Sequence, residues 1–196
     1  MNTRFQKPQN SDPALAQLRV PPHSIEAEQS ILGGLLLDNQ AWDRMGDIIT
    51  DTDFYRDEHR RIFRQIRKLL ENAKPADVVT VAEALDAAGE GDKTGGLAYL
   101  GELAANTPSA ANIKRYAEIV RERAVLRQLV ATADEIAADA LNPLGRDAET
   151  LLDEAESKIF AIAEAGAGHS EGFVHINPLL TQVVERIQEL HDRDNP

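Results

Sequence analysis

The sequence predicts an all-α protein, in which a small orthogonal helical bundle is followed by a long antiparallel helical hairpin and a separate linker helix. Three observations support this fold class. Aromatic residues make up only 5% of the 196 residues, and Ala and Leu supply most of the apolar content. Apolar residues recur three or four positions apart in eight segments, which is helical spacing. Val78 and Val79 are the best candidate for a strand, and two residues are too few to form one.

The first half of the chain predicts a globular helical subdomain over residues 21–108, after a flexible N-terminal arm over residues 1–20. Its helices are expected at 24–37, 39–50, 57–72, 80–88 and 95–105, with a turn at 50–55. Ser24 is a typical N-cap, because its side-chain oxygen can accept from a free backbone N–H group. Glu26 and Glu28 then face the positive end of the helix dipole in the first turn.

Two sequence features of this subdomain lead to specific structural predictions. Gly33 and Gly34 weaken the first helix by about 1 kcal/mol each relative to Ala, so we expect a neighbouring element to pack closely against them. Thr80 and Glu83 form a T-x-x-E capping box, which predicts that the fourth helix starts at Thr80. Gly89 is expected to end that helix.

The second half predicts a long antiparallel hairpin over residues 109–165. Residues 109–141 contain neither Pro nor Gly and would extend about 50 Å as one helix. A turn containing Pro143 and Gly145 follows, and heptad-like spacing predicts a return helix over 148–165. Two antiparallel helices bury one face against each other, and the remaining apolar surface favours a symmetric dimer contact. The residues expected to mediate self-association are Ile113, Tyr116, Val120, Leu152, Ile159 and Ile162.

A final amphipathic helix is expected at 177–192, within a terminal segment 177–196 that follows a flexible glycine-rich linker over 166–176. Its apolar residues are Leu180, Val183, Ile187 and Leu190. An isolated helix of this length is only marginally stable in water, so its apolar stripe needs a groove. The groove belongs either to a partner, which would make the helix a docking arm, or to the same chain.

A basic stripe on the third helix is a second candidate binding feature. Its members are Arg56, Arg60, Arg64, Arg67 and Lys68. Steps of three and four residues place most of them on one helix face. The stripe either pairs with nearby acids such as Asp57 and Glu71 or binds an acidic surface of a partner.

The composition excludes several kinds of site. The chain has no Cys, so a disulfide, a thiol nucleophile and a Cys-ligated metal are all excluded. Lys93 and Thr94 lie near glycines but lack the G-x-x-x-x-G-K-[ST] spacing that cradles phosphates. The five His residues form no metal-binding pair at helical spacing. We therefore expect no catalytic, cofactor-binding or metal site in this chain, and no enzymatic activity of its own.

Charge and hydropathy limit the classes of partner that this chain is expected to bind. The formal net charge of −12 predicts weak, salt-sensitive DNA binding, because an acidic surface repels phosphates. The longest apolar run, Ile31–Leu37, is far shorter than the about 20 residues of a membrane helix. The first 20 residues also lack the apolar block of a signal peptide. The expected location is the cytoplasm, with no membrane partner.

Six blocks of the sequence carry a further signal. They are Val20–Asp38, Asp53–Phe63, Asp77–Thr80, Gly95–Leu100, Thr107–Ala117 and Gly172–Pro178. In this order they resemble the N-terminal domain of DnaB-type replicative DNA helicases, followed by the entry to the linker helix of that family. The resemblance covers about residues 20–196, nearly the whole chain.

The resemblance implies a function. The full-length protein would be a ring-shaped hexamer that unwinds duplex DNA in the 5′-to-3′ direction, with ATP and Mg²⁺ bound in a RecA-like motor domain. This chain would be the collar and linker of such a helicase, since it ends where the motor is expected to begin.

The resemblance also implies partners. The N-terminal domains would pair through the hairpin and assemble as a trimer of dimers. The collar would receive the C-terminal domain of primase, and the terminal helix would pack on the motor domain of a neighbouring subunit. A helicase loader is a further partner that the family admits, and the setting is a bacterial or phage replisome.

Two other functions remain compatible with the residues. A stand-alone protein with the collar fold could bind and inhibit a full-length helicase ring. A motor domain encoded downstream of Pro196 would distinguish a helicase fragment from such a regulator. A helical-bundle enzyme is disfavoured by the missing catalytic constellation, and a titration with ATP and divalent metals would test it.

Overall fold

The computed structural model describes residues 20–167 of the chain. Its α-helices are α2 (Ile25–Leu37), α3 (Asp57–Glu71), α4 (Val78–Ala87), α5 (Gly96–Ala105), α6 (Ile113–Leu141) and α7 (Ala148–Ala167). Three short 3-10 helices accompany them, namely η1 (Asn39–Arg44), η2 (Asp51–Asp53) and η3 (Gly91–Lys93). No strand is present between residues 20 and 167, which confirms the predicted all-α class.

Some predictions fall outside this range. The terminal helix at 177–192, with Leu180, Val183, Ile187 and Leu190, lies outside the described residues. The same holds for the N-terminal arm up to residue 19 and for the linker from residue 168 onward. Within residues 20–167, none of the helices combines the length and the apolar character that crossing a membrane requires.

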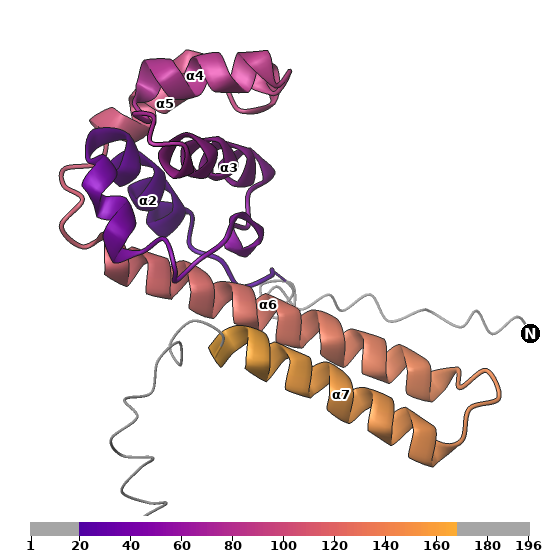
Figure 1. Ribbon diagram of the computed structural model, residues 1–196. Coiled ribbons are helices and arrows are strands. Elements are labelled where there is room, and N and C mark those ends of the chain that lie inside the picture. The colour runs from indigo at the N-terminus through magenta and orange to yellow at the C-terminus, as the bar shows by residue number, and fades with distance from the viewer. Residues whose placement is uncertain (1–19, 168–196) are drawn as a thin grey trace, which may run out of the picture.

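The described residues form two parts, which we call the head (residues 20–112) and the hairpin (α6 and α7). Figure 1 shows α6 running below the helices of the head and continuing beyond them, with α7 lying alongside its far half. The first half of α6 belongs to both parts, because Ile113, Ala117 and Val120 are buried in the core of the head. The hairpin is therefore attached to the head through one continuous helix.

The core of the head is built from large aliphatic and aromatic side chains. Its fully buried members include Ile31, Leu32, Leu35, Phe54, Ile62, Phe63, Ile66, Leu85 and Leu100. The rings of Phe54 and Phe63 lie 4.8 Å apart, and Trp42 packs 5.8 Å from Phe63. The apolar positions that the helical spacing selected on α2 and α3 thus face one another.

A close approach explains the glycine at position 33. A Cβ atom there would lie 2.1 Å from Thr107 Oγ1 and 2.3 Å from the Leu103 carbonyl oxygen. No side chain fits at such distances, so only glycine lets α2 pack against the end of α5. This confirms the expected close neighbour of the first helix.

Three predicted boundaries are wrong in detail. The expected helix at 39–50 is only the 3-10 helix η1. The Asp38 carboxylate accepts from Gln40 N at the start of η1. The chain then turns after Trp42, because the Trp42 carbonyl accepts from the backbone N–H groups of both Met45 and Gly46. The other two corrections concern the starts of α4 and α6.

Helix α4 starts at Val78, two residues earlier than the T-x-x-E box predicted. Asp77 is the N-cap, and its carboxylate accepts from Val79 N at 2.9 Å and Thr80 N at 2.8 Å. Thr80 Oγ1 accepts in return from Asp77 N at 2.8 Å, so Thr80 closes the box instead of opening it. Helix α6 starts at Ile113 because Ser109 Oγ accepts from Ala111 N and holds a turn there.

Candidate functional site

The hairpin exposes apolar side chains that its own chain leaves uncovered. No residue from 148 to 165 is buried, although this segment carries a complete apolar stripe. Leu152 is 70% exposed, Ile159 50% and Phe160 61%. Ile136 of α6 and Leu151 of α7 line a groove of about 370 Å³ between the two helices. Several large apolar side chains left exposed on one helix are typical of a protein-interaction site.

The structure divides the residues predicted for self-association into two groups. Leu152 and Ile159 are exposed, and Ile162 is half-buried beside a second groove of about 360 Å³. Ile113 and Val120 are wrong for this role, because both are buried in the core of their own chain. Tyr116 is half-buried and packs against that core.

Ion pairs join the two helices near the tip of the hairpin. Arg146 Nη2 lies 2.8 Å from Asp139 Oδ1 and Arg146 Nη1 lies 2.5 Å from Glu154 Oε2. Lys158 Nζ lies 3.0 Å from Asp139 and 3.3 Å from Glu135. Hydrogen bonds from Arg146 and Lys158 lower the pKa of Asp139, and the bond to Asp139 raises the pKa of Lys158.

These pairs leave the far half of the hairpin acidic. Residues 131–167 contain nine acidic residues against two basic ones, Arg146 and Lys158. Both basic residues are already paired within the hairpin. The exposed apolar stripe is therefore framed by net negative charge, so the burial of apolar area has to outweigh charge repulsion wherever two such hairpins pair.

The arginines of the basic stripe are engaged by their own chain. Arg56 pairs with Glu58, and Arg60 Nε donates to the Phe54 carbonyl at 2.6 Å. Arg64 and Arg67 share Asp51, at 2.8 and 3.7 Å, and Arg67 also lies 3.5 Å from Glu71. Lys68 lines a shallow groove beside Gln65 and Asn72. This pairing favours the structural interpretation of the stripe over a docking surface.

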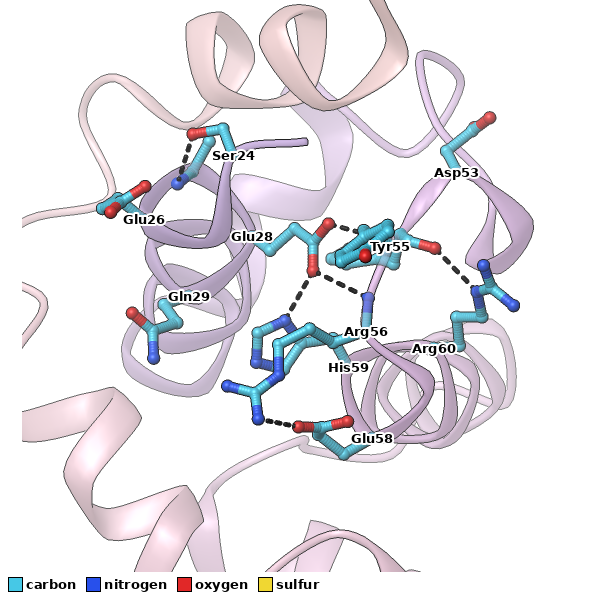
Figure 2. Close-up of polar contacts among 12 residues, drawn as sticks. Ser24, Glu26, Glu28, Gln29, Asp53, Tyr55, Arg56, Glu58, His59 and Arg60 are labelled. Carbon is cyan, nitrogen blue, oxygen red and sulfur yellow. Dashed lines mark hydrogen bonds and ion pairs between the residues drawn. The ribbon is translucent and has the colours of Figure 1, made fainter. Parts of the chain in front are cut away.

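A buried polar centre links three helices of the head. Glu28 of α2 lies opposite His59 of α3 in Figure 2, with Glu28 Oε2 2.7 Å from His59 Nδ1. His59 Nε2 lies 2.7 Å from the hydroxyl of Tyr99 on α5. The Glu28 carboxylate also accepts from Tyr55 N at 2.6 Å and Arg56 N at 3.4 Å.

The order carboxylate, imidazole, hydroxyl has the form of a catalytic relay, but its position argues for a structural role. The side chains of Glu28 and His59 are 1% and 0% exposed, so no substrate reaches them. Among residues 20–167, every buried side-chain polar atom has a hydrogen-bond partner. A fully satisfied buried network holds the helices that contribute to it in one arrangement.

The sequence pattern placed Glu28 in the first turn of a helix, facing the positive end of its dipole, and indicated no role for His59. One signal was available: Glu28 lies three and seven residues before Ile31 and Leu35, on the apolar face of α2. A carboxylate on a buried face requires a buried partner. The identity of that partner could not be read from the sequence.

Within residues 20–167, His, Asp and Glu form no group of three that could hold a metal ion.

The junction of head and hairpin contains two arginines of α6. Arg121 Nη1 lies 2.7 Å from Asp53 Oδ1. Arg127 donates to the Pro22 carbonyl at 2.8 Å and to the Asp53 carbonyl, and its guanidinium lies 5.7 Å from the centre of the Tyr55 ring. Burial lowers the pKa of Arg127. These contacts connect α6 to the segment that enters the head and to η2.

Comparisons with known proteins agree with this architecture. Residues 20–122 match the family model described as the DnaB-like helicase N terminal domain. The chain is 44% identical over 186 residues to the replicative DNA helicase DnaB of Haemophilus influenzae, covering 95% of this chain and 40% of that protein. It is 41% identical over 176 residues to the corresponding helicase of Geobacillus stearothermophilus, covering 90% and 38%. The chain thus spans about two fifths of the length of these curated relatives.

Solved structures show the same fold. The N-terminal domain of DnaB helicase from Mycobacterium tuberculosis superposes with a TM-score of 0.70 at 37% identity, covering 72% of this chain and 99% of that chain. A DnaB-like replicative helicase, whose structure was described with its interactions with primase, gives a TM-score of 0.63 at 23% identity, covering 85% and 36%. On the family match and these likenesses, the chain belongs to the DnaB-like helicase N-terminal domain family.

Proposed function

We propose that this chain is the collar of a hexameric replicative DNA helicase, in which it mediates oligomerisation and recruits primase. The observation that carries the proposal is the exposed apolar face of the hairpin, with Leu152, Ile159 and Phe160. A partner must cover such a face, and the family supplies two candidates: a second collar and primase. The relatives are named replicative helicases, and one structural neighbour was described with its interactions with primase.

In this proposal the unwinding activity belongs to the full-length protein. The matched relatives extend well beyond the length of this chain, so a motor domain has room to follow. ATP and Mg²⁺ would bind in that domain, and the collar would contribute neither a catalytic group nor a cofactor ligand. A net charge of −12 suits a part of the ring that contacts proteins more than DNA.

The partners follow from the hairpin and from the terminal segment. Two collars would pair through Leu152, Ile159 and Ile162, and three pairs would close a trimer of dimers. The helix expected at 177–192 would dock on the motor domain of a neighbouring subunit through Leu180, Val183, Ile187 and Leu190. A helicase loader would act on the same assembly.

Molar mass measured by light scattering tests the proposal directly. The chain is 21.5 kDa, so a dimer and a hexamer are well separated from a monomer. We expect a dimer or a larger even oligomer alone, and a heavier complex after addition of the C-terminal domain of the cognate primase. A monomer at high concentration that leaves primase in its own peak would contradict the proposal.

A further inference from the structure

One side chain connects the head to the end of α7. Arg121 lies on α6 and points one guanidinium nitrogen, Nη1, at Asp53 Oδ1 of η2, at 2.7 Å. Its other terminal nitrogen, Nη2, donates to the backbone carbonyl of Ala165 in the last turns of α7. The planar fork of an arginine suits such a bridge, because its two donors keep a fixed angle to each other.

The head side of this bridge is held rigidly. The side chain of Asp53 is only 2% exposed, and its second oxygen, Oδ2, accepts from Thr50 N at 2.7 Å. Arg127 donates to the carbonyl of the same residue. Asp53 therefore has both its side chain and its backbone oxygen engaged, and it defines the direction in which Arg121 points.

The α7 side of the bridge has little other support. The last carbonyls of a helix lack partners within the helix and carry the negative end of its dipole, so a cation is favourable there. Residues 148–165 include no fully buried side chain, and among residues 159–165 Ile162 alone is half-buried, beside a groove shared with α6. The first turn is held differently, since Thr150 N donates to Asp147 Oδ1 at 2.9 Å and the ion pairs of Arg146 lie nearby. The support for α7 thus differs between its two ends.

We propose that Arg121 is a positioning residue that couples the head to the end of α7, so that the position of the last turns of α7 depends on Asp53. The coupling is reciprocal, since two sites that share one bridge influence each other equally. A partner that moves η2 releases the last turns of α7, and a displacement of those turns shifts η2.

Amide hydrogen exchange with a matched pair of variants tests the coupling. Asp53→Asn weakens the hold on Arg121, whereas Asp51→Asn removes the same charge from the same 3-10 helix but affects the partners of Arg64 and Arg67. We expect Asp53→Asn to accelerate exchange at residues 160–165 about tenfold and Asp51→Asn to leave it unchanged. Equal exchange at residues 160–165 in two folded variants would overturn the proposal.

Two further variants keep the test informative if Asp53→Asn unfolds. Arg121→Gln should accelerate exchange at residues 160–165 as well, whereas Arg115→Gln, an exposed arginine on the same helix, should not. The chain has no Cys, so cysteines introduced by Glu83→Cys and Glu164→Cys can be spin-labelled uniquely, diluted with unlabelled protein. Arg121→Gln should broaden the distribution of distances between spin labels at positions 83 and 164. The distribution between labels introduced by Glu83→Cys and Glu149→Cys should stay narrow. A distribution as narrow as in the Arg115→Gln background would refute the bridge.

Discussion

The head and the hairpin are built from the same kind of amphipathic helix, yet they bury very different fractions of their apolar residues. In the head, the stripes of α2, α3, α4 and α5 meet, and Ile31, Phe63 and Leu100 are fully buried. In the hairpin, α7 packs mainly along the far half of α6, and Leu152 and Phe160 stay exposed. An apolar stripe indicates that a helix packs against another element. The topology of the fold decides whether that element belongs to the same chain.

The polar contacts of the two parts differ in the same way. The head buries Glu28 with His59 between packed helices, whereas the hairpin holds Asp139, Arg146 and Lys158 near its surface. A buried polar group left without its partner loses the hydrogen bond and stays cut off from water, while water replaces most of a surface ion pair. Changes in the head should therefore alter stability much more than changes in the hairpin.

The largest loss of stability is expected from Glu28→Ala. The change removes the acceptor of Tyr55 N and Arg56 N and leaves His59 buried without its carboxylate. Breaking a buried pair in this way costs about 3–5 kcal/mol. Urea unfolding followed by circular dichroism measures it. Glu26→Ala, an exposed carboxylate in the same turn, serves as the control and should stay within about 0.5 kcal/mol of wild type. Equal midpoints for the two variants would show that the buried centre does not stabilise the head.

A smaller loss of stability is expected from Gly33→Ala. The new methyl group would overlap Thr107 Oγ1 and the Leu103 carbonyl, so α2 and the end of α5 must move apart, at a cost of about 2–3 kcal/mol. The matched control is Gly101→Ala in the middle of α5, where a Cβ meets no atom within 4 Å. Ala favours a helix more than Gly does, so the free energy of unfolding of this control should rise by about 0.5–1 kcal/mol. Thermal unfolding of the two variants measures the difference. A Gly33→Ala protein as stable as wild type would contradict the close packing.

In the hairpin, Ile159→Asp should change assembly and leave the stability of the head unchanged. Under the proposed function, the carboxylate would be buried without a partner in the dimer contact, which weakens association about a hundredfold or more. Sedimentation at several concentrations should show a folded monomer. Ser157→Asp adds the same charge to an exposed position of α7 and should leave the oligomer intact. If Ile159→Asp sediments like Ser157→Asp, this stripe is not the contact.

The smallest effect is expected at the ion pairs of the hairpin tip and depends on pH. The pKa of Asp139 is lower in the folded chain than the usual value of about 3.9. Its contribution to stability is therefore present above about pH 4 and is lost as the pH falls through the lowered pKa. Asp139→Asn should accelerate amide exchange in the hairpin at pH 7 relative to wild type, and the difference should shrink as the pH falls below about 4. Asp134→Asn removes an exposed carboxylate from the same helix and should leave amide exchange in the hairpin at the wild-type rate.

Local sequence features predicted most helices correctly because their causes are local. Spacing, caps and breakers act within a few residues, so α2, α3, α5 and α7 lie close to their predicted ranges. The turn between α6 and α7 follows the same logic, since Leu144 and Gly145 have φ angles of 50° and 85° after Pro143. The errors are local too. Where two caps compete, as at Asp77 and Thr80, the pattern alone does not choose between them.

The sequence by itself determined that this chain is helical, that it carries more apolar stripe than five short helices can cover, and that six ordered blocks resemble one family of helicase domains. Only the tertiary structure decided which groups meet across long separations. Glu28 finds His59 31 residues away, and Arg121 finds Asp53 68 residues away. It also assigned Ile113 and Val120 to the core of the head and left Ile159 to the surface, although all three occupy apolar positions of the same hairpin pattern. Burial depends on the neighbours that the fold supplies, and helical periodicity reports only which side of a helix faces them.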